Sequence, residues 1–137
     1  MSVKYNQCLV VSRHEILEAQ KKDVEAICSN FTIIPELPVD MSKLKQLIQP
    51  YDAIIGTFPL NLQIQIIQNK KVLVIFVMTS LGVANTEEEA EQKASQYPGR
   101  TAILTPSKEG EKYRVTRYDG LKLVKDIKVV DEWLIQH

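Results

Sequence analysis

Four apolar runs of the kind that form buried strands alternate with segments in which apolar residues recur at helical spacing. The strand-type runs cover residues 7–11, 31–34, 51–55 and 72–77, and the helical segments cover about 14–28, 41–48, 59–68 and 86–97. Strands that alternate with helices form mostly parallel sheets with helices on both faces. The pattern therefore predicts an α/β fold with a Rossmann-like, mostly parallel sheet flanked by helices.

The last third of the chain has a β-rich pattern instead. Residues 101–104 and 113–118 are predicted strands, Asp119-Gly120 predicts a hairpin turn, and 121–130 is expected to pair back with a bulge near Lys125-Asp126. We therefore expect a single domain over 1–137, with an α/β core over about 1–100 and a C-terminal extension over about 101–137. The extension is expected either to continue the same sheet in antiparallel fashion or to pack on a partner subunit.

Short polar breaks follow three of the predicted strands, and they indicate a composite site. The breaks are Ser12-Arg13-His14, Gly56-Thr57-Phe58-Pro59 and Met78-Thr79-Ser80. In open α/β sheets, ligands bind outside the carboxyl ends of the strands, near the point where the strand order reverses. These breaks are therefore expected to meet around one ligand.

The first break carries the most capable chemistry. Ser12 followed by Glu15 fits a capping box that starts the first helix, which is a purely structural role. That arrangement places Arg13 and His14 in the first helical turn, where cations oppose the helix dipole. A bound phosphate would compensate them, because free amides, guanidinium and imidazole would all face it.

The other two breaks each have a structural and a functional interpretation. Gly56 allows either a tight strand exit or close approach of a ligand, and Phe58 is either a core residue or a surface for base stacking. Thr57 offers a hydroxyl. Met78, Thr79 and Ser80 form either a plain loop or, if their strand lies beside the site, further ligand contacts.

Composition narrows the class of protein without naming a partner. The chain has 137 residues, 45% hydrophobic and 25% charged, with 17 basic and 17 acidic side chains. This balance gives no argument for binding duplex nucleic acid or a membrane surface. Cys8 and Cys28 lack metal-site spacing and are predicted to be buried thiols of a reducing compartment. No membrane span or signal-peptide pattern is recognised, so a cytoplasmic location is expected.

Several common chemistries find no support in the sequence. His14 and His137 are the only histidines, and no P-loop, G-x-S-x-G or G-x-G-x-x-G motif occurs, so neither a metal nor a cofactor is predicted. The basic stretch with Lys112, Arg114, Arg117 and Lys122 is either a solvated face or, with its tyrosines, a nucleic-acid platform.

The first two breaks together resemble a known family. Ser12-Arg13-His14 ends the first strand, and residues 52–60 read Asp-Ala-Ile-Ile-Gly-Thr-Phe-Pro-Leu. This pair of motifs resembles the small CRISPR-associated Rossmann-like accessory proteins of type III systems. The resemblance covers about residues 8–80, and Phe58 stands where the family pattern has leucine.

The resemblance implies that the ligand is cyclic oligoadenylate, the second messenger of type III CRISPR defence, removed either in defence or in viral counter-defence. Cleavage would need no metal: a ribose 2′-hydroxyl attacks the adjacent phosphate and leaves a 2′,3′-cyclic phosphate. Arg13 would clamp the phosphate, His14 would transfer a proton, and Ser12 and Thr57 would orient phosphate oxygens. A symmetric ring would suit a homodimer or a higher homo-oligomer.

Two further functions stay open at this stage. A module of the same fold would sense or sequester the nucleotide without cleaving it. An oligomeric interaction protein would bind no nucleotide, and its Arg13 and His14 side chains would be solvent-exposed without contacting a ligand.

Overall fold

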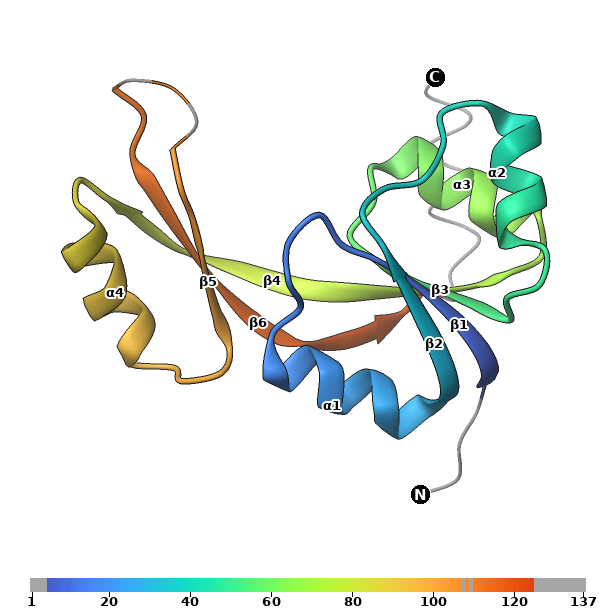
Figure 1. Ribbon diagram of the computed structural model, residues 1–137, viewed down its shortest axis with the longest axis horizontal. Coiled ribbons are helices and arrows are strands. Elements are labelled where there is room, and N and C mark those ends of the chain that lie inside the picture. The colour runs from blue at the N-terminus through green and yellow to red at the C-terminus, as the bar shows by residue number, and fades with distance from the viewer. Residues whose placement is uncertain (1–4, 107, 109, 125–137) are drawn as a thin grey trace.

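The computed structural model describes residues 5–106, 108 and 110–124, and it has the predicted α/β architecture (Figure 1). The strands are β1 (Tyr5–Val11), β2 (Cys28–Ile34), β3 (Ala53–Gly56), β4 (Val72–Ala84), β5 (Thr101–Leu104) and β6 (Tyr113–Leu123). The helices are α1 (Glu18–Ile27), α2 (Met41–Ile48), α3 (Leu60–Gln68) and α4 (Glu87–Ser95). The fold class predicted from the apolar pattern is confirmed.

One mixed sheet joins all the strands, in the order β2-β1-β3-β4-β6-β5. β2, β1, β3 and β4 are parallel, whereas β6 is antiparallel to both β4 and β5. The chain first adds β2 on one side of β1 and then crosses to add β3 on the other side. The strand order therefore reverses between β1 and β3, at whose carboxyl ends Val11 and Gly56 stand in register.

Helices cover both faces of the parallel part of the sheet (Figure 1). On the α1 face, Val10, Val24 and Ile55 belong to one buried cluster. On the opposite face, Leu9, Leu44 and Ile54 belong to a second cluster, with α2 and α3. Alternate residues of β1 and β3 thus point to opposite cores, which explains why these strands read as continuous apolar runs.

The sheet continues beyond the parallel core as an arm. The arm consists of residues 78–84 of β4, 113–118 of β6, and β5, and α4 packs beside it (Figure 1). Ala84, Ala90 and Val115 form the buried centre of that packing. Over its described residues, up to residue 124, the C-terminal extension therefore continues the same sheet in antiparallel fashion, which is one of the two arrangements expected for it.

Tyr118 ties the arm to the core. Its ring is fully buried and meets Phe76 edge-on, at 5.8 Å between ring centroids. Its hydroxyl donates a hydrogen bond of 2.6 Å to Asp23 of α1. Burial and this hydrogen bond raise the pKa of Tyr118, so the phenol stays protonated.

One prediction about the β-rich region is wrong. Asp119-Gly120 does not form a hairpin turn, because β6 runs through it and continues pairing with β4. The pairing register shifts there, since Gly120 lies opposite Val77 while Tyr118 lies opposite Met78. Gly120 has a φ of 125°, which glycine adopts readily, so the dipeptide makes a bulge instead. The bulge predicted near residues 125 and 126 lies outside the described residues.

The prediction of two free thiols is also wrong. Cys8 of β1 and Cys28 of β2 are both buried, as expected, but they are joined in a disulfide. Their Cα atoms are 6.3 Å apart, within the range that a disulfide bridges. The parallel pairing of β1 and β2 creates this proximity, which the separation of 20 residues along the chain does not reveal.

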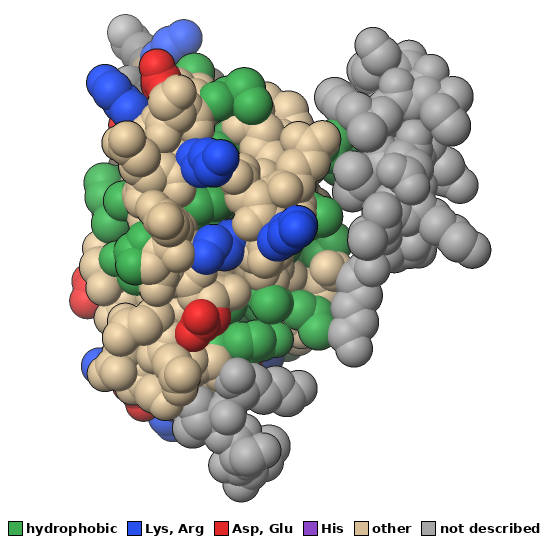
Figure 2. Space-filling view, turned by 90° about the vertical axis from the view of Figure 1, so that its right-hand side faces the viewer, with side chains coloured by type: hydrophobic (Ala, Val, Ile, Leu, Met, Phe, Trp, Pro, Cys, Tyr) green, Lys and Arg blue, Asp and Glu red, His purple; other side chains and the backbone are tan. Residues whose placement is uncertain are grey.

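The outer surface beside α2 and α3 is dominated by uncharged side chains. Figure 2 views the molecule from that end, and Lys and Arg side chains lie among uncharged ones without forming a continuous basic surface on this face. Within the described part of the chain, no helix has the length and apolar character required to cross a membrane.

Candidate functional site

A cavity of about 630 Å³ lies at the carboxyl ends of β1 and β3. We call it the main cavity. Six of the predicted site residues line it: Ser12, Arg13, His14, Thr57, Phe58 and Met78. Gly56, Thr79 and Ser80 do not. The first two polar breaks therefore meet at the point where the strand order reverses, and the third contributes one residue.

The loop that carries Arg13 and His14 is not the start of a helix. α1 begins at Glu18, and its N-cap is Leu17, whose backbone N–H donates to the Gln20 side chain at 2.8 Å. Ser12 instead continues the β1–β2 pairing, because its N–H donates to Ile34 O at 2.9 Å. The predicted Ser12–Glu15 capping box is wrong, and with it the argument that two cations oppose a helix dipole.

Ser12 shapes the loop in a different way. Its hydroxyl donates a 2.6 Å hydrogen bond to the backbone carbonyl of His14, two residues ahead. Local bonds of this kind fix a turn. The serine proton is therefore directed to the backbone. In this way Ser12 fixes the loop that carries Arg13 and His14, the two residues that line the main cavity.

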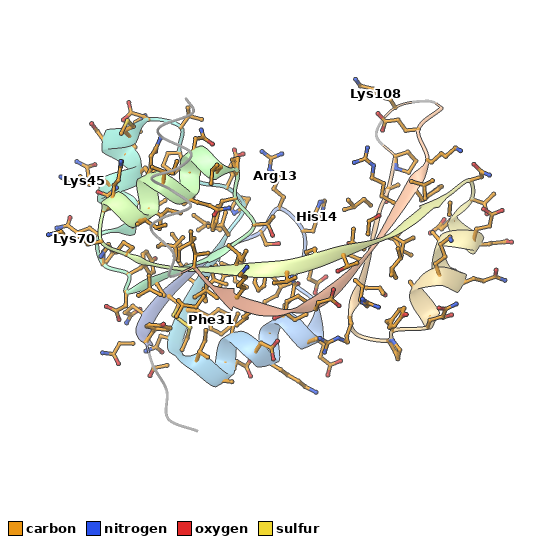
Figure 3. All side chains as sticks on the ribbon, turned by 180° about the vertical axis from the view of Figure 1, so that it is seen from behind. Arg13, His14, Phe31, Lys45, Lys70 and Lys108 are labelled. Carbon is orange, nitrogen blue, oxygen red and sulfur yellow. A yellow bond between two sulfur atoms is a disulfide. The ribbon has the colours of Figure 1, made fainter. Side chains whose placement is uncertain are left out.

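Arg13 and His14 both line the main cavity but differ in their partners. Figure 3 shows them on the same loop, between the α2–α3 layer and the arm whose tip carries Lys108. Arg13 forms an ion pair of 3.2 Å with Glu36, and both side chains are mostly exposed. His14 is exposed and has no side-chain partner among the residues that the structure describes. An exposed ion pair contributes at most about 1 kcal/mol, so an anionic ligand can replace Glu36.

Gly56 and Phe58 belong more to packing than to ligand contact. Gly56 is buried, and a Cβ atom there would lie 2.8 Å from Phe58 Cζ and 2.8 Å from Val11 O. The Phe58 ring therefore occupies the space beside the glycine, and it is only 8% exposed. Glycine permits this close approach of ring and strand, and Phe58 presents only a small part of its surface to the cavity.

The third break is not a break, because β4 continues without interruption to Ala84. Thr79 and Ser80 pair with Arg117 and Thr116 of β6, and both are exposed. Thr79 donates a hydrogen bond to Asp119, which also accepts one of 2.7 Å from Arg117. These two hydrogen bonds hold the pKa of Asp119 below its usual value. Thr79 therefore stabilises the bulge rather than a ligand.

The basic stretch of β6 does not act as one surface. Arg117 is held by Asp119 and by the face of the Tyr97 ring, at 4.8 Å from its centroid. Lys112 and Arg114 line a separate cavity of about 430 Å³ beside Leu104, and Lys122 lines neither cavity. The platform interpretation therefore has no continuous row of cations to support it.

The other lining residues were not predicted to contact a ligand, although Glu15 and Pro59 belong to the sequence motifs described above. Two are acidic, Glu15 and Glu36, and one is a buried amide, Gln20. The rest are mostly apolar or small: Val11, Leu17, Pro35, Leu37, Val39, Pro59, Leu62, Phe76, Ala102, Leu104 and Thr116. Three of these come from the arm, so the extension forms one wall of the cavity. Among these residues, the position of Glu36, two residues after the end of β2, could have signalled a site role.

The arrangement suits an anion attached to a flat or apolar group. Arg13 and the Thr57 hydroxyl can donate hydrogen bonds to oxygens, His14 can exchange a proton, and the remaining walls are largely apolar. Within the described ranges, no three His, Cys, Asp or Glu side chains come together in a way that could hold a metal ion. No protein-family model, curated protein or solved structure matches the chain.

Proposed function

We propose that the chain binds cyclic oligoadenylate in the main cavity and opens the ring without a metal ion. The observation that supports this most is that Arg13, His14 and Thr57 line one cavity together with apolar walls, at the reversal of strand order. A nucleotide needs both kinds of surface, since its phosphate requires donors and its base requires an apolar or stacking contact.

The reaction is an internal displacement. A ribose 2′-hydroxyl oxygen attacks the adjacent phosphorus, the bond to the 5′-oxygen breaks, and the products carry a 2′,3′-cyclic phosphate and a 5′-hydroxyl. One proton leaves the 2′-hydroxyl and one is added to the 5′-oxygen, and His14 carries out one of these transfers. Arg13 stabilises the charge that develops on the phosphate oxygens, and Thr57 orients them. When His14 protonates the 5′-oxygen, a carboxylate of Glu15 or Glu36, which line the same cavity, accepts the proton that leaves the 2′-hydroxyl.

The size of the cavity bears on how a ring would be held. About 630 Å³ is within the usual range for a small-molecule site, and it accommodates part of a cyclic oligonucleotide rather than all of it. A ring with rotational symmetry would therefore engage two copies of the chain, each with its own Arg13 and His14. The proposed substrate also implies a cytoplasmic location, for which a disulfide such as Cys8–Cys28 would be uncommon.

A second function, sequestration without cleavage, is favoured by one observation. His14 is the one imidazole among the residues that line the cavity, whereas ring opening requires one proton to be removed and another to be added. Such a site can hold an anion even if no proton transfer takes place. In this case the ring would stay intact when bound.

Replacing Arg13 with alanine tests the proposed binding site. We expect the dissociation constant for cyclic tetra-adenylate, measured by calorimetry, to rise about tenfold, because one charge-assisted contact in a partly exposed site is lost. Lys45→Ala is the control, since Lys45 is an exposed cation of α2 far from Arg13 in Figure 3 and does not line the cavity. Equal affinity in Arg13→Ala and wild type would contradict the assignment, and no binding by the wild type would favour the interaction-protein alternative.

A further inference from the structure

Gln20 is the one buried polar residue among the described part of the chain, with 8% of its surface exposed, and it lines the main cavity. Its oxygen Oε1 accepts a hydrogen bond of 2.8 Å from the Leu17 backbone N–H, at the start of α1. Its nitrogen Nε2 has a single partner, the sulfur of Met78 at 4.0 Å. Met78 lines the cavity as well.

The two ends of this amide are therefore unequally satisfied. A thioether sulfur is a weak acceptor, and a buried donor without a good partner costs about 1–3 kcal/mol. Rotating the amide would not help, because Oε1 is needed to accept from Leu17. The carboxamide is thus held with its N–H₂ group beside the cavity, where a ligand acceptor would complete its hydrogen bonding.

We propose that Gln20 recognises the base of the bound nucleotide by donating a hydrogen bond from Nε2 to a ring nitrogen of adenine. The inference rests on the proposed function, which assigns a nucleotide to this cavity. In the proposed function Arg13 and Thr57 hold the phosphate, while Gln20 of α1 lines the same cavity together with Leu17, Phe76 and Met78. This apolar surrounding suits a base, whose edge then needs one polar partner. Gln20 is accordingly a specificity-determining residue and takes no part in proton transfer.

Gln20→Glu separates this contact from the structural role of the side chain. Glutamate keeps an oxygen that caps the Leu17 N–H, as in a capping box, but it has no N–H₂ group to donate. The added negative charge repels any phosphate ligand, so affinity alone does not isolate the base contact. The base contact is isolated by the ratio of the affinities for adenosine monophosphate and ribose 5-phosphate, because the two probes share the phosphate and differ in the base.

Calorimetry with these two probes is the experiment. We expect the wild type to prefer adenosine monophosphate, and Gln20→Glu to reduce the preference about tenfold, the value of one hydrogen bond near 1.4 kcal/mol. The neutral variant Gln20→Met is expected to lose the preference too. Gln92→Glu makes the same chemical change on exposed α4, away from the cavity, and is expected to keep it.

Each result decides one of the two proposals. If Gln20→Glu and Gln20→Met keep the full preference, the role of Gln20 is overturned, while the proposed function stands as long as Arg13→Ala weakens both probes. A wild type that binds both probes equally also overturns the role of Gln20. A wild type that binds neither probe nor cyclic tetra-adenylate overturns the proposed function, and the base contact with it.

Discussion

Replacing His14 with glutamine is expected to slow the opening of cyclic tetra-adenylate by about 10²–10⁴-fold, the usual contribution of a positioned acid or base. His14 is the one histidine among the described residues, and it lines the cavity beside Arg13. Glutamine keeps a polar side chain of similar size but cannot exchange a proton at neutral pH. We therefore expect ring binding to change by less than about threefold while cleavage is lost. The rate is measured by chromatographic separation of intact ring from linear products.

The same substitution at the only other histidine of the chain, His137→Gln, is the control. It is expected to cleave at the wild-type rate. A His14→Gln protein that cleaves as fast as wild type would remove His14 from the reaction. Loss of binding together with cleavage would make His14 a ligand contact instead.

Gly56→Ala is expected to lower the free energy of unfolding by about 1–3 kcal/mol, the usual cost of overfilling a packed core. The added Cβ would lie 2.8 Å from Phe58 Cζ and 2.8 Å from Val11 O. The ring is nearly buried and the carbonyl belongs to β1, so neither neighbour moves freely. Because β1 and β3 carry the two halves of the site, ligand affinity is expected to fall as well. Urea unfolding followed by circular dichroism measures the stability.

A double variant separates the two clashes. Phe58→Leu removes the ring contact, so Gly56→Ala in that background is expected to cost less than in the wild type, but still to be destabilising because Val11 O remains in place. Thr57→Ala is the neighbouring control, since an exposed residue outside the packing contributes within about 0.5 kcal/mol. Gly56→Ala with wild-type stability would show that the strands separate easily here.

The parallel core was predictable because its signals are local. Continuous apolar runs identify strands covered on both faces, and α2 has the predicted limits, Met41–Ile48, with Asp40 as its cap. The meeting of the first two polar breaks in one cavity could also be predicted, because ligand sites in open α/β sheets lie at the carboxyl ends of the strands, near the reversal of strand order. The wrong predictions of a Ser12–Glu15 capping box and of an Asp119-Gly120 hairpin turn have the same cause, because in both cases tertiary structure overrides a local motif. Ser12 and Glu15 match a capping box, yet Ser12 pairs with β2, and the N-cap of α1 is Leu17, whose N–H donates to the Gln20 side chain.

The arm shows what sequence patterns leave undetermined. Thr79, Ser80 and Gly82 interrupt the apolar run of β4, but pairing with β6 keeps them in the strand. Asp119-Gly120 matches a hairpin turn, and only the partner strand determines that it forms a bulge. The disulfide likewise depends on the spatial proximity of β1 and β2. For the same reason, the contribution of arm residues to the main cavity could not be predicted from the sequence alone.

Metal-free ring opening is tested directly by incubating the wild-type protein with cyclic tetra-adenylate in excess EDTA, followed by separation and mass analysis of the nucleotides. We expect linear products that end in a 2′,3′-cyclic phosphate, since Arg13, His14 and Thr57 are proposed to open the ring without a metal ion. A ring that stays intact but elutes with the protein would show that the protein sequesters the ring and does not cleave it. A ring that stays intact and does not bind would contradict both the proposed binding and the proposed cleavage.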